Sequence, residues 1–171
     1  MSTEAKPSPV AAVEEAVAGY SDEEKPLFPY LALVGAYNAA LAGVLIVARA
    51  SGRPIPRLGF GDLLLFGAAT HKLSRRVAKD KVTAPLRAPF TEYQEPGGPA
   101  EVEEKPRGSG AKRAIGELVL CPYCLDQWIG TAFVSGSIFA PRVTRLVAGL
   151  FTSVGIADFL HVAYKASQKR L

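Results

Sequence analysis

The chain has 171 residues, of which 49% are hydrophobic and 21% are charged, and its formal net charge is +4. This length suffices for one domain. The hydrophobic and charged residues occupy separate blocks, whereas a soluble domain would intersperse them, and no P-loop or Gly-x-Gly-x-x-Gly pattern predicts a nucleotide site.

Residues 1–25 form an N-terminal segment rich in Ala, Pro, Ser and Glu, with few large apolar side chains. This composition predicts a disordered segment. Its length and its acidic end do not fit a cleaved signal peptide. The apolar block that follows is therefore expected to be retained as a membrane helix.

Four apolar blocks define a predicted membrane domain over residues 26–165. The blocks are Tyr30–Ala48, Leu58–Ala69, Leu118–Ala140 and Leu146–Val162. The first carries no charge over about 19 residues, and a rise of 1.5 Å per residue extends it about 28 Å, close to the hydrocarbon thickness of a bilayer. The second is shorter and contains Asp62, although its helical pattern continues through Val77. A short span, a re-entrant segment and an interfacial helix remain open for it.

Small residues recur at intervals of four in the first block, at Gly35, Ala39 and Gly43. Similar spacing occurs in the third and fourth blocks. Such stripes let helix backbones approach closely in lipid. They predict a tight bundle and make a homo-oligomer possible.

The distribution of basic residues predicts the topology, because Lys and Arg accumulate on the cytoplasmic side. If all four blocks span, fifteen of the twenty Lys and Arg residues share one side with both termini. The five on the other side are Arg49, Arg53, Arg57, Arg142 and Arg145. We therefore predict an all-α integral membrane bundle of three to four transmembrane helices in the inner membrane, with both termini cytoplasmic and a basic tail at 166–171.

The loop over residues 70–113, between the second and third helices, is then cytoplasmic. Its part over 92–111 is rich in Pro, Gly and acidic residues and is predicted to be mobile. Two prolines in the segment Thr83–Phe90 predict an extended backbone around Arg87. Either this segment docks back on the bundle with Phe90 buried, or it presents Arg87 to a phosphate or carboxylate.

Two stretches together resemble a known bacterial family. They are ATHKLSRRVAKDKVTAPLRAPFTEYQ (Ala69–Gln94) and GELVLCPYCLDQWIG (Gly116–Gly130). This pair, in this order, is similar to the membrane family catalogued as domain of unknown function 1360, over about residues 30–165. The resemblance implies a multi-pass bacterial membrane protein, and it supplies no reaction, substrate or catalytic residues.

Cys121-Pro122-Tyr123-Cys124 matches a glutaredoxin active-site pattern, but the βαβ context of that fold is missing. The pair precedes Trp128 at the head of an apolar helix. The cysteines could be packing residues or a redox-responsive dithiol. They could also form half of a zinc or iron site completed by His71 and His161, which the four-span model places at the same leaflet.

Asp158 and His161 share one face of the last apolar block, where ionisable groups are costly and usually paired. The preferred interpretation is a structural carboxylate that pairs with Arg75, Arg76 or Arg87. A basic cluster in the loop next to the second block favours anionic lipid headgroups over nucleic acid as its partner. This cluster comprises Lys72, Arg75, Arg76, Lys79 and Lys81.

The leading hypothesis is a non-enzymatic scaffold or partner-binding membrane protein, and Thr83 and Arg87 are its candidate binding residues. The alternative is a membrane-embedded Cys-x-x-Cys redox or metal-binding protein at the cytoplasmic leaflet.

Overall fold

The computed structural model describes residues 15, 17–21 and 25–169, and these are mainly helical. The elements in order are α2 (Leu27–Ala50), α3 (Phe60–Lys79), the 3-10 turn η1 (Lys81–Thr83), α4 (Ala84–Arg87), β1 (Thr91–Pro96), β2 (Val102–Pro106), α5 (Gly110–Leu120), α6 (Pro122–Phe139) and α7 (Pro141–Gln168). Most of the segment 1–25, predicted to be disordered, and the end of the basic tail lie outside the described residues.

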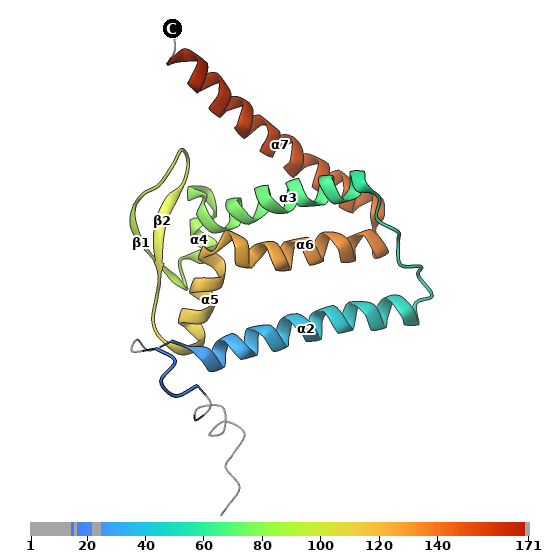
Figure 1. The fold of residues 1–171 in the computed structure, drawn as a ribbon, viewed down its shortest axis with the longest axis horizontal. Coiled ribbons are helices and arrows are strands. Elements are labelled where there is room, and N and C mark those ends of the chain that lie inside the picture. Colours follow the sequence, from blue (N-terminus) through green and yellow to red (C-terminus); the bar gives the residue numbers. More distant parts are fainter. Residues whose placement is uncertain (1–14, 16, 22–24, 170–171) are drawn as a thin grey trace, which may run out of the picture.

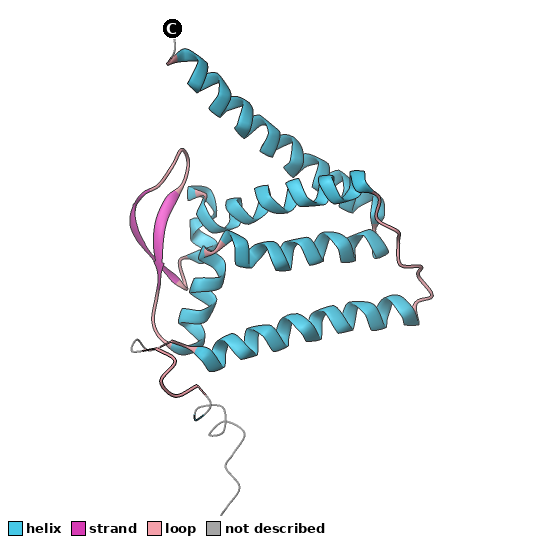
Figure 2. Ribbon diagram, viewed as in Figure 1, coloured by secondary structure: helices cyan, strands magenta, loops and turns pink. Residues whose placement is uncertain are grey.

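Three helices, α2, α3 and α6, run alongside one another, and α3 points opposite to the other two (Figure 1). The two strands, α4 and α5 gather at one end of these helices, here named the hairpin end. The connections from α2 to α3 and from α6 to α7 lie at the opposite end (Figure 2). Helix α7 begins at that opposite end, crosses α3 and diverges from it toward the C-terminus.

Helix α3 is central because it presents a face of small side chains. Ala69, Ser74 and Ala78 are fully buried on this helix. Small side chains allow neighbouring helices to approach closely, and the main partners of α3 are α6 and α7. Near the start of α3, the ring of Phe66 stacks on that of Phe133 in α6, with centroids 5.9 Å apart. The core of the chain therefore lies along α3.

The second apolar block lies within one continuous helix, whereas the third is divided between two helices. Helix α3 runs without a break to Lys79 and is capped at Asp80, so the predicted continuation through Val77 is confirmed. The third block is two helices, since Cys121 has extended backbone (φ −100°, ψ 104°) and Pro122 begins α6. Proline lacks an N–H and fits the first turn of a helix, which explains why a new helix starts there.

Two of the described helices, α2 and α7, are long and apolar enough to cross a membrane. Only 6% of the most apolar 18-residue window of each is buried within the chain. Both helices are therefore largely unburied within the chain, which weakly suggests membrane association. Because α3 and α6 do not meet the same criterion of length and composition, a bundle of three or four spans is not confirmed.

The all-α fold class is wrong in one respect, because part of the segment predicted to be a mobile loop forms an antiparallel β-hairpin. Thr91 pairs with Pro106 and Pro96 with Val102, and the register shifts between Tyr93 and Glu95. Strand β2 also packs against α5. The composition of this segment is typical of a loop, but the pairing depends on a partner strand and on a helix that composition does not reveal.

The small-residue stripes differ in whether another helix of the chain packs against them. A Cβ placed on Gly136 of α6 would lie 2.6 Å from Oγ1 of Thr144 in α7, so this stripe packs inside the chain. A Cβ on Gly35 or Gly43 of α2 would meet nothing within 4 Å. Association of the α2 stripe with a second copy therefore stays a prediction.

The tightest glycine contact predicts the effect of a substitution. A Cβ on Gly116 of α5 would lie 2.5 Å from the carbonyl oxygen of Phe90 and 3.1 Å from Cβ of Pro106. We expect Gly116→Ala to lower the free energy of unfolding by about 1–3 kcal/mol through overpacking. The measurement is thermal unfolding of the detergent-solubilised chain.

Gly67→Ala is the matched control, because a Cβ at Gly67 in α3 meets nothing within 4 Å. It should be neutral or stabilise by up to about 1 kcal/mol. Equal melting of the two variants would contradict the packing of α5 against the hairpin.

Candidate functional site

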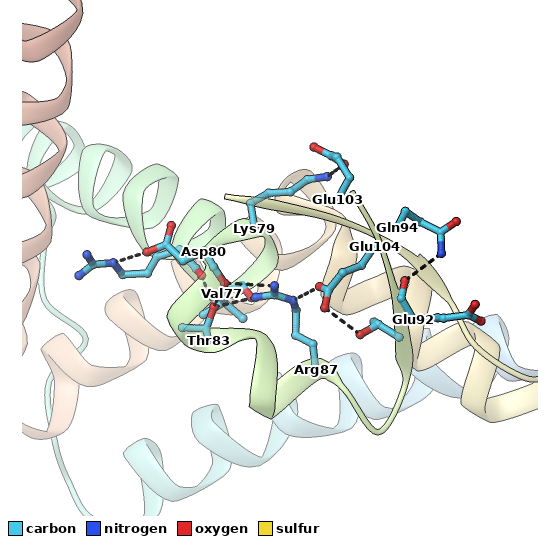
Figure 3. Close-up of polar contacts among 11 residues, drawn as sticks. Val77, Lys79, Asp80, Thr83, Arg87, Glu92, Gln94, Glu103 and Glu104 are labelled. Atoms are coloured by element: carbon cyan, nitrogen blue, oxygen red, sulfur yellow. Dashed lines mark hydrogen bonds and ion pairs between the residues drawn. The ribbon is translucent and has the colours of Figure 1, made fainter. Parts of the chain in front are cut away.

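One arginine, Arg87, holds the hairpin against the end of α3 and is 1% exposed (Figure 3). Its Nε donates to the carboxylate of Glu104 in β2 at 2.6 Å. Its Nη1 and Nη2 donate to the carbonyl oxygens of Val77 at 2.6 Å and Asp80 at 3.1 Å. The last carbonyl groups of a helix lack partners within the helix, so Arg87 satisfies the end of α3 while it binds the hairpin.

Thr83 extends this network. Its hydroxyl donates to the carbonyl oxygen of Arg76 at 2.7 Å and accepts from Nη1 of Arg87 at 2.6 Å. The second carboxylate oxygen of Glu104 accepts from the hydroxyl of Thr91 at 3.3 Å. The polar groups of Thr83 and Arg87 are thus engaged within the chain, which gives these two residues a structural role.

The extended backbone predicted around Arg87 is wrong. The segment forms a 3-10 turn followed by the helical turn α4, with proline in its first turn, where proline is tolerated. Of the two open alternatives, docking back on the bundle matches the structure. Phe90 is half-buried, and its carbonyl oxygen accepts from the backbone N–H of Arg107 at 2.9 Å.

A groove of about 700 Å³ opens between α3, α7 and the turn of the hairpin, and we name it the α3–α7 groove. Helix α3 lines it with four basic or imidazole side chains, His71, Lys72, Arg75 and Arg76. Helix α7 contributes His161 and Lys165, together with the apolar side chains of Val154, Phe159 and Val162. The groove thus combines a polar wall with a largely apolar one.

Three ion pairs organise the walls of the α3–α7 groove. They are Lys72–Asp158 at 2.5 Å, Arg75–Glu101 at 2.6 Å and Arg76–Asp80 at 2.8 Å. Asp158 therefore pairs with a basic side chain of α3, and its partner is Lys72 instead of one of the three predicted arginines. The pair between Arg75 and Glu101 joins α3 to the hairpin.

A second groove of about 410 Å³ lies between α2 and the helices α5 and α6, and we name it the α2–α6 groove. Trp128 lines it, and its ring packs edge-on against Tyr37 with centroids 5.3 Å apart. The hydroxyl of Tyr37 also hydrogen-bonds Thr131 at 2.8 Å and accepts from Gln127 at 2.7 Å. These contacts attach the otherwise exposed α2 to α6.

Glu117 closes the α2–α6 groove at the hairpin end. It accepts hydrogen bonds from the hydroxyl of Tyr30 and from Nε of Arg113. Burial raises the pKa of Glu117, but these two hydrogen bonds outweigh burial and leave the pKa below its usual value. Glu117 is therefore a carboxylate at neutral pH, and it ties α5 to the first turn of α2.

The predicted metal ligands lie on different faces of the bundle. Cys121 and Cys124 form a disulfide, and Cys124 lines the α2–α6 groove. His71 and His161 line the α3–α7 groove. Within the described residues, no cluster of three or more His, Cys, Asp or Glu side chains could hold a metal ion. The structure therefore does not assemble the four-residue zinc or iron site.

Sequence reasoning missed three acidic residues that the structure singles out. Glu101 and Glu104 lie in the segment that composition had assigned to a mobile loop. Asp126 lies in α6, and its Oδ1 is buried with no hydrogen-bond partner among the described residues. Its position inside an apolar block was a usable signal, because ionisable groups in such blocks are usually functional or paired.

Comparison with known proteins gives a family but no activity. A family model described as a protein of unknown function (DUF1360) matches residues 65–164, which leaves α2 outside the match. The chain is also similar to sporulation protein YjcA of Bacillus subtilis (strain 168), with 27% identity over 101 residues that cover 57% of this chain and 86% of the relative. No solved structure matches the chain.

The buried ion pair of the hairpin predicts a large effect of one substitution. Glu104→Ala leaves Arg87 buried without its carboxylate, and we expect a loss of about 3–5 kcal/mol in the free energy of unfolding. The measurements are thermal unfolding and the rate at which a protease cleaves the hairpin.

Glu92→Ala is the matched control on the same hairpin. Glu92 pairs with Lys105 at 3.5 Å, and both side chains are more than half exposed. Its loss should cost less than about 1 kcal/mol. Similar cleavage rates for the two variants would show that Glu104 does not hold the hairpin.

Proposed function

The chain belongs to DUF1360, a family of proteins of unknown function, and we propose that it is a non-enzymatic integral membrane protein that binds a partner at its hairpin end. In this proposal α2 and α7 anchor the chain in the inner membrane. The hairpin, α4 and α5 form an ordered platform on the cytoplasmic face.

The observation that carries the proposal is the exposure of the two apolar helices. Leu31 and Ile46 in α2 are 52% and 67% exposed, and Leu146 and Leu160 in α7 are 74% and 65% exposed. Water does not tolerate so much contiguous apolar surface on a small monomer, whereas lipid does. A bilayer is therefore the solvent that suits these helices.

Helix directions and charge support a four-crossing arrangement. The chain passes from end to end in α2, returns in α3, and repeats this in α6 and α7 (Figure 1). In such an arrangement thirteen of the eighteen Lys and Arg residues that the structure describes belong to segments at the hairpin end. The excess of basic residues on the cytoplasmic side of membrane proteins supports a cytoplasmic location for that end and for both termini.

The binding role is supported by the way the hairpin end is built. Its charged side chains are joined in ion pairs that fix α3, the hairpin and α7 to one another. A platform held in this way presents a shaped surface with little loss of conformational entropy on binding.

Reporter fusions test the topology. Green fluorescent protein fused after Leu171 should fluoresce, and alkaline phosphatase fused there should be inactive, because the phosphatase folds only outside the cytoplasm. Phosphatase inserted at Gly52, between α2 and α3, should be active.

Cell fractionation accompanies the fusions. The chain should stay in the membrane pellet after a high-salt wash. Active phosphatase at the C-terminus, or release of the chain into the soluble fraction, would reject the proposed arrangement.

A second candidate function rests on the disulfide between Cys121 and Cys124. If the hairpin end is cytoplasmic, this bond lies in a reducing compartment, where disulfides are usually catalytic or redox-sensing. Cys121 caps α6, with its Sγ 3.2 Å from the backbone nitrogen of Cys124. Reduction would therefore change the start of the helix that carries Trp128 into the α2–α6 groove.

The redox candidate predicts a reversible reduction. After equilibration in glutathione buffers, maleimide labelling should give a midpoint potential above about −300 mV. The fluorescence of Trp128, the only tryptophan of the chain, should change at the same potential. A Cys121→Ser/Cys124→Ser variant should show neither change. A disulfide that resists every glutathione ratio is structural and would end this candidate.

A further inference from the structure

The α3–α7 groove exists because the two helices touch and then separate. A Cβ on Gly155 of α7 would lie 3.5 Å from Cβ of Lys72, which marks a close contact between the helices. Beyond it, residues 158–168 of α7 are exposed. The turn of the hairpin, residues 98–101, forms the third side of the groove. The groove is therefore open along the second half of α7.

The α3 wall offers unused hydrogen-bond donors. A guanidinium has five N–H groups. Arg75 gives one to Glu101 and Arg76 gives one to Asp80 in the hydrogen bonds of the described residues. Both side chains are more than 40% exposed. Their remaining donors suit the oxygens of a phosphate, which arginine binds at several atoms at once.

The groove has one more positive than negative charge. Its three carboxylates belong to Asp80, Glu101 and Asp158, and each is paired with a cation of α3. Lys165 on the α7 wall has no acidic partner among the described residues. The net charge of the lining is therefore positive and favours an anion.

Part of the α7 wall next to these charges is apolar. Phe159 and Val162, which are 68% and 67% exposed, line the groove between Asp158 and Lys165. A soluble anion would leave these side chains in water. An amphiphile would cover them with its hydrocarbon chain while its headgroup meets the arginines.

We propose that the α3–α7 groove binds an anionic phospholipid, with its phosphate at Arg75, Arg76 and Lys165 and an acyl chain along Phe159 and Val162. This inference rests on the proposed function, since it requires α7 to lie in the membrane. It assigns a lipid headgroup, not a free phosphate, to the site.

Native mass spectrometry of the full chain in mild detergent tests the inference. The probes are dioleoyl phosphatidylglycerol, dioleoyl phosphatidylcholine and inorganic phosphate. Phosphatidylglycerol should bind at least about fivefold more tightly than phosphatidylcholine, since one basic residue near an anionic lipid contributes about that factor. Inorganic phosphate at the same concentration should not displace it.

Two substitutions locate the binding. Lys165→Gln and Arg75→Gln should each weaken phosphatidylglycerol binding about fivefold and leave phosphatidylcholine binding unchanged. Lys169→Gln makes the same change of charge one helical turn beyond the groove and should have no effect. Lys165 is exposed and forms no ion pair with the described residues, so Lys165→Gln should stay folded. This variant therefore tests the inference even if Arg75→Gln unfolds.

Each outcome decides the inference. Equal binding of the two lipids, or equal binding by the Lys165 and Lys169 variants, would overturn it. Displacement by inorganic phosphate would assign the groove to a soluble anion and overturn the lipid assignment. None of these results affects the reporter fusions, so failure here is distinguishable from failure of the membrane topology.

Discussion

The buried ion pair between Arg87 and Glu104 is the interaction on which the hairpin end depends. Removing both charges from water costs several kcal/mol per ion, and their mutual attraction offsets this only when other hydrogen bonds satisfy the remaining donors. The carbonyl oxygens of Val77 and Asp80 and the hydroxyl of Thr83 supply those bonds. The same carbonyls end α3 and lack partners in the helix. The end of one helix is thus satisfied by the side chain that docks the hairpin.

The docked hairpin in turn shapes the α3–α7 groove. Glu101 directly precedes β2, forms an isolated bridge with Asp80, and pairs with Arg75. The turn of the hairpin can line the groove only because β2 is fixed against α3 and α5. Helix α7 forms the opposite wall, and its pair between Asp158 and Lys72 sets where it leaves α3. Loss of the Arg87 network would therefore displace one wall while leaving the contact between α3 and α7 in place.

The sequence was most informative where structure follows from local composition. The apolar blocks predicted the helices α2, α3 and α7. The third block was predicted as one helix, but it is divided at Pro122 into the end of α5 and the whole of α6. The hairpin and the burial of Arg87 could not be predicted, because each depends on residues distant in sequence. Arg87 pairs with the carboxylate of Glu104, which lies 17 residues away in a segment whose composition is typical of a loop. The separation of the four proposed metal ligands could not be predicted for a related reason. The four-span hypothesis predicts one leaflet for His71, His161 and the cysteines, but it does not predict which face of the bundle each side chain occupies.

The charge distribution and the disulfide both bear on which compartment the hairpin end faces. In the proposed topology, the positive-inside rule places this end in the cytoplasm. A disulfide between Cys121 and Cys124 is not expected to persist there unless it is formed and reduced in turn. The proposed topology and the disulfide are compatible if the pair responds to redox state, whereas a purely structural disulfide would require this end to face an oxidising compartment. Since Cys124 lines the same groove as Tyr37 and Trp128, a redox change at the start of α6 would act where α2 is attached. The compartment that the hairpin end faces therefore determines whether this disulfide is structural or redox-responsive.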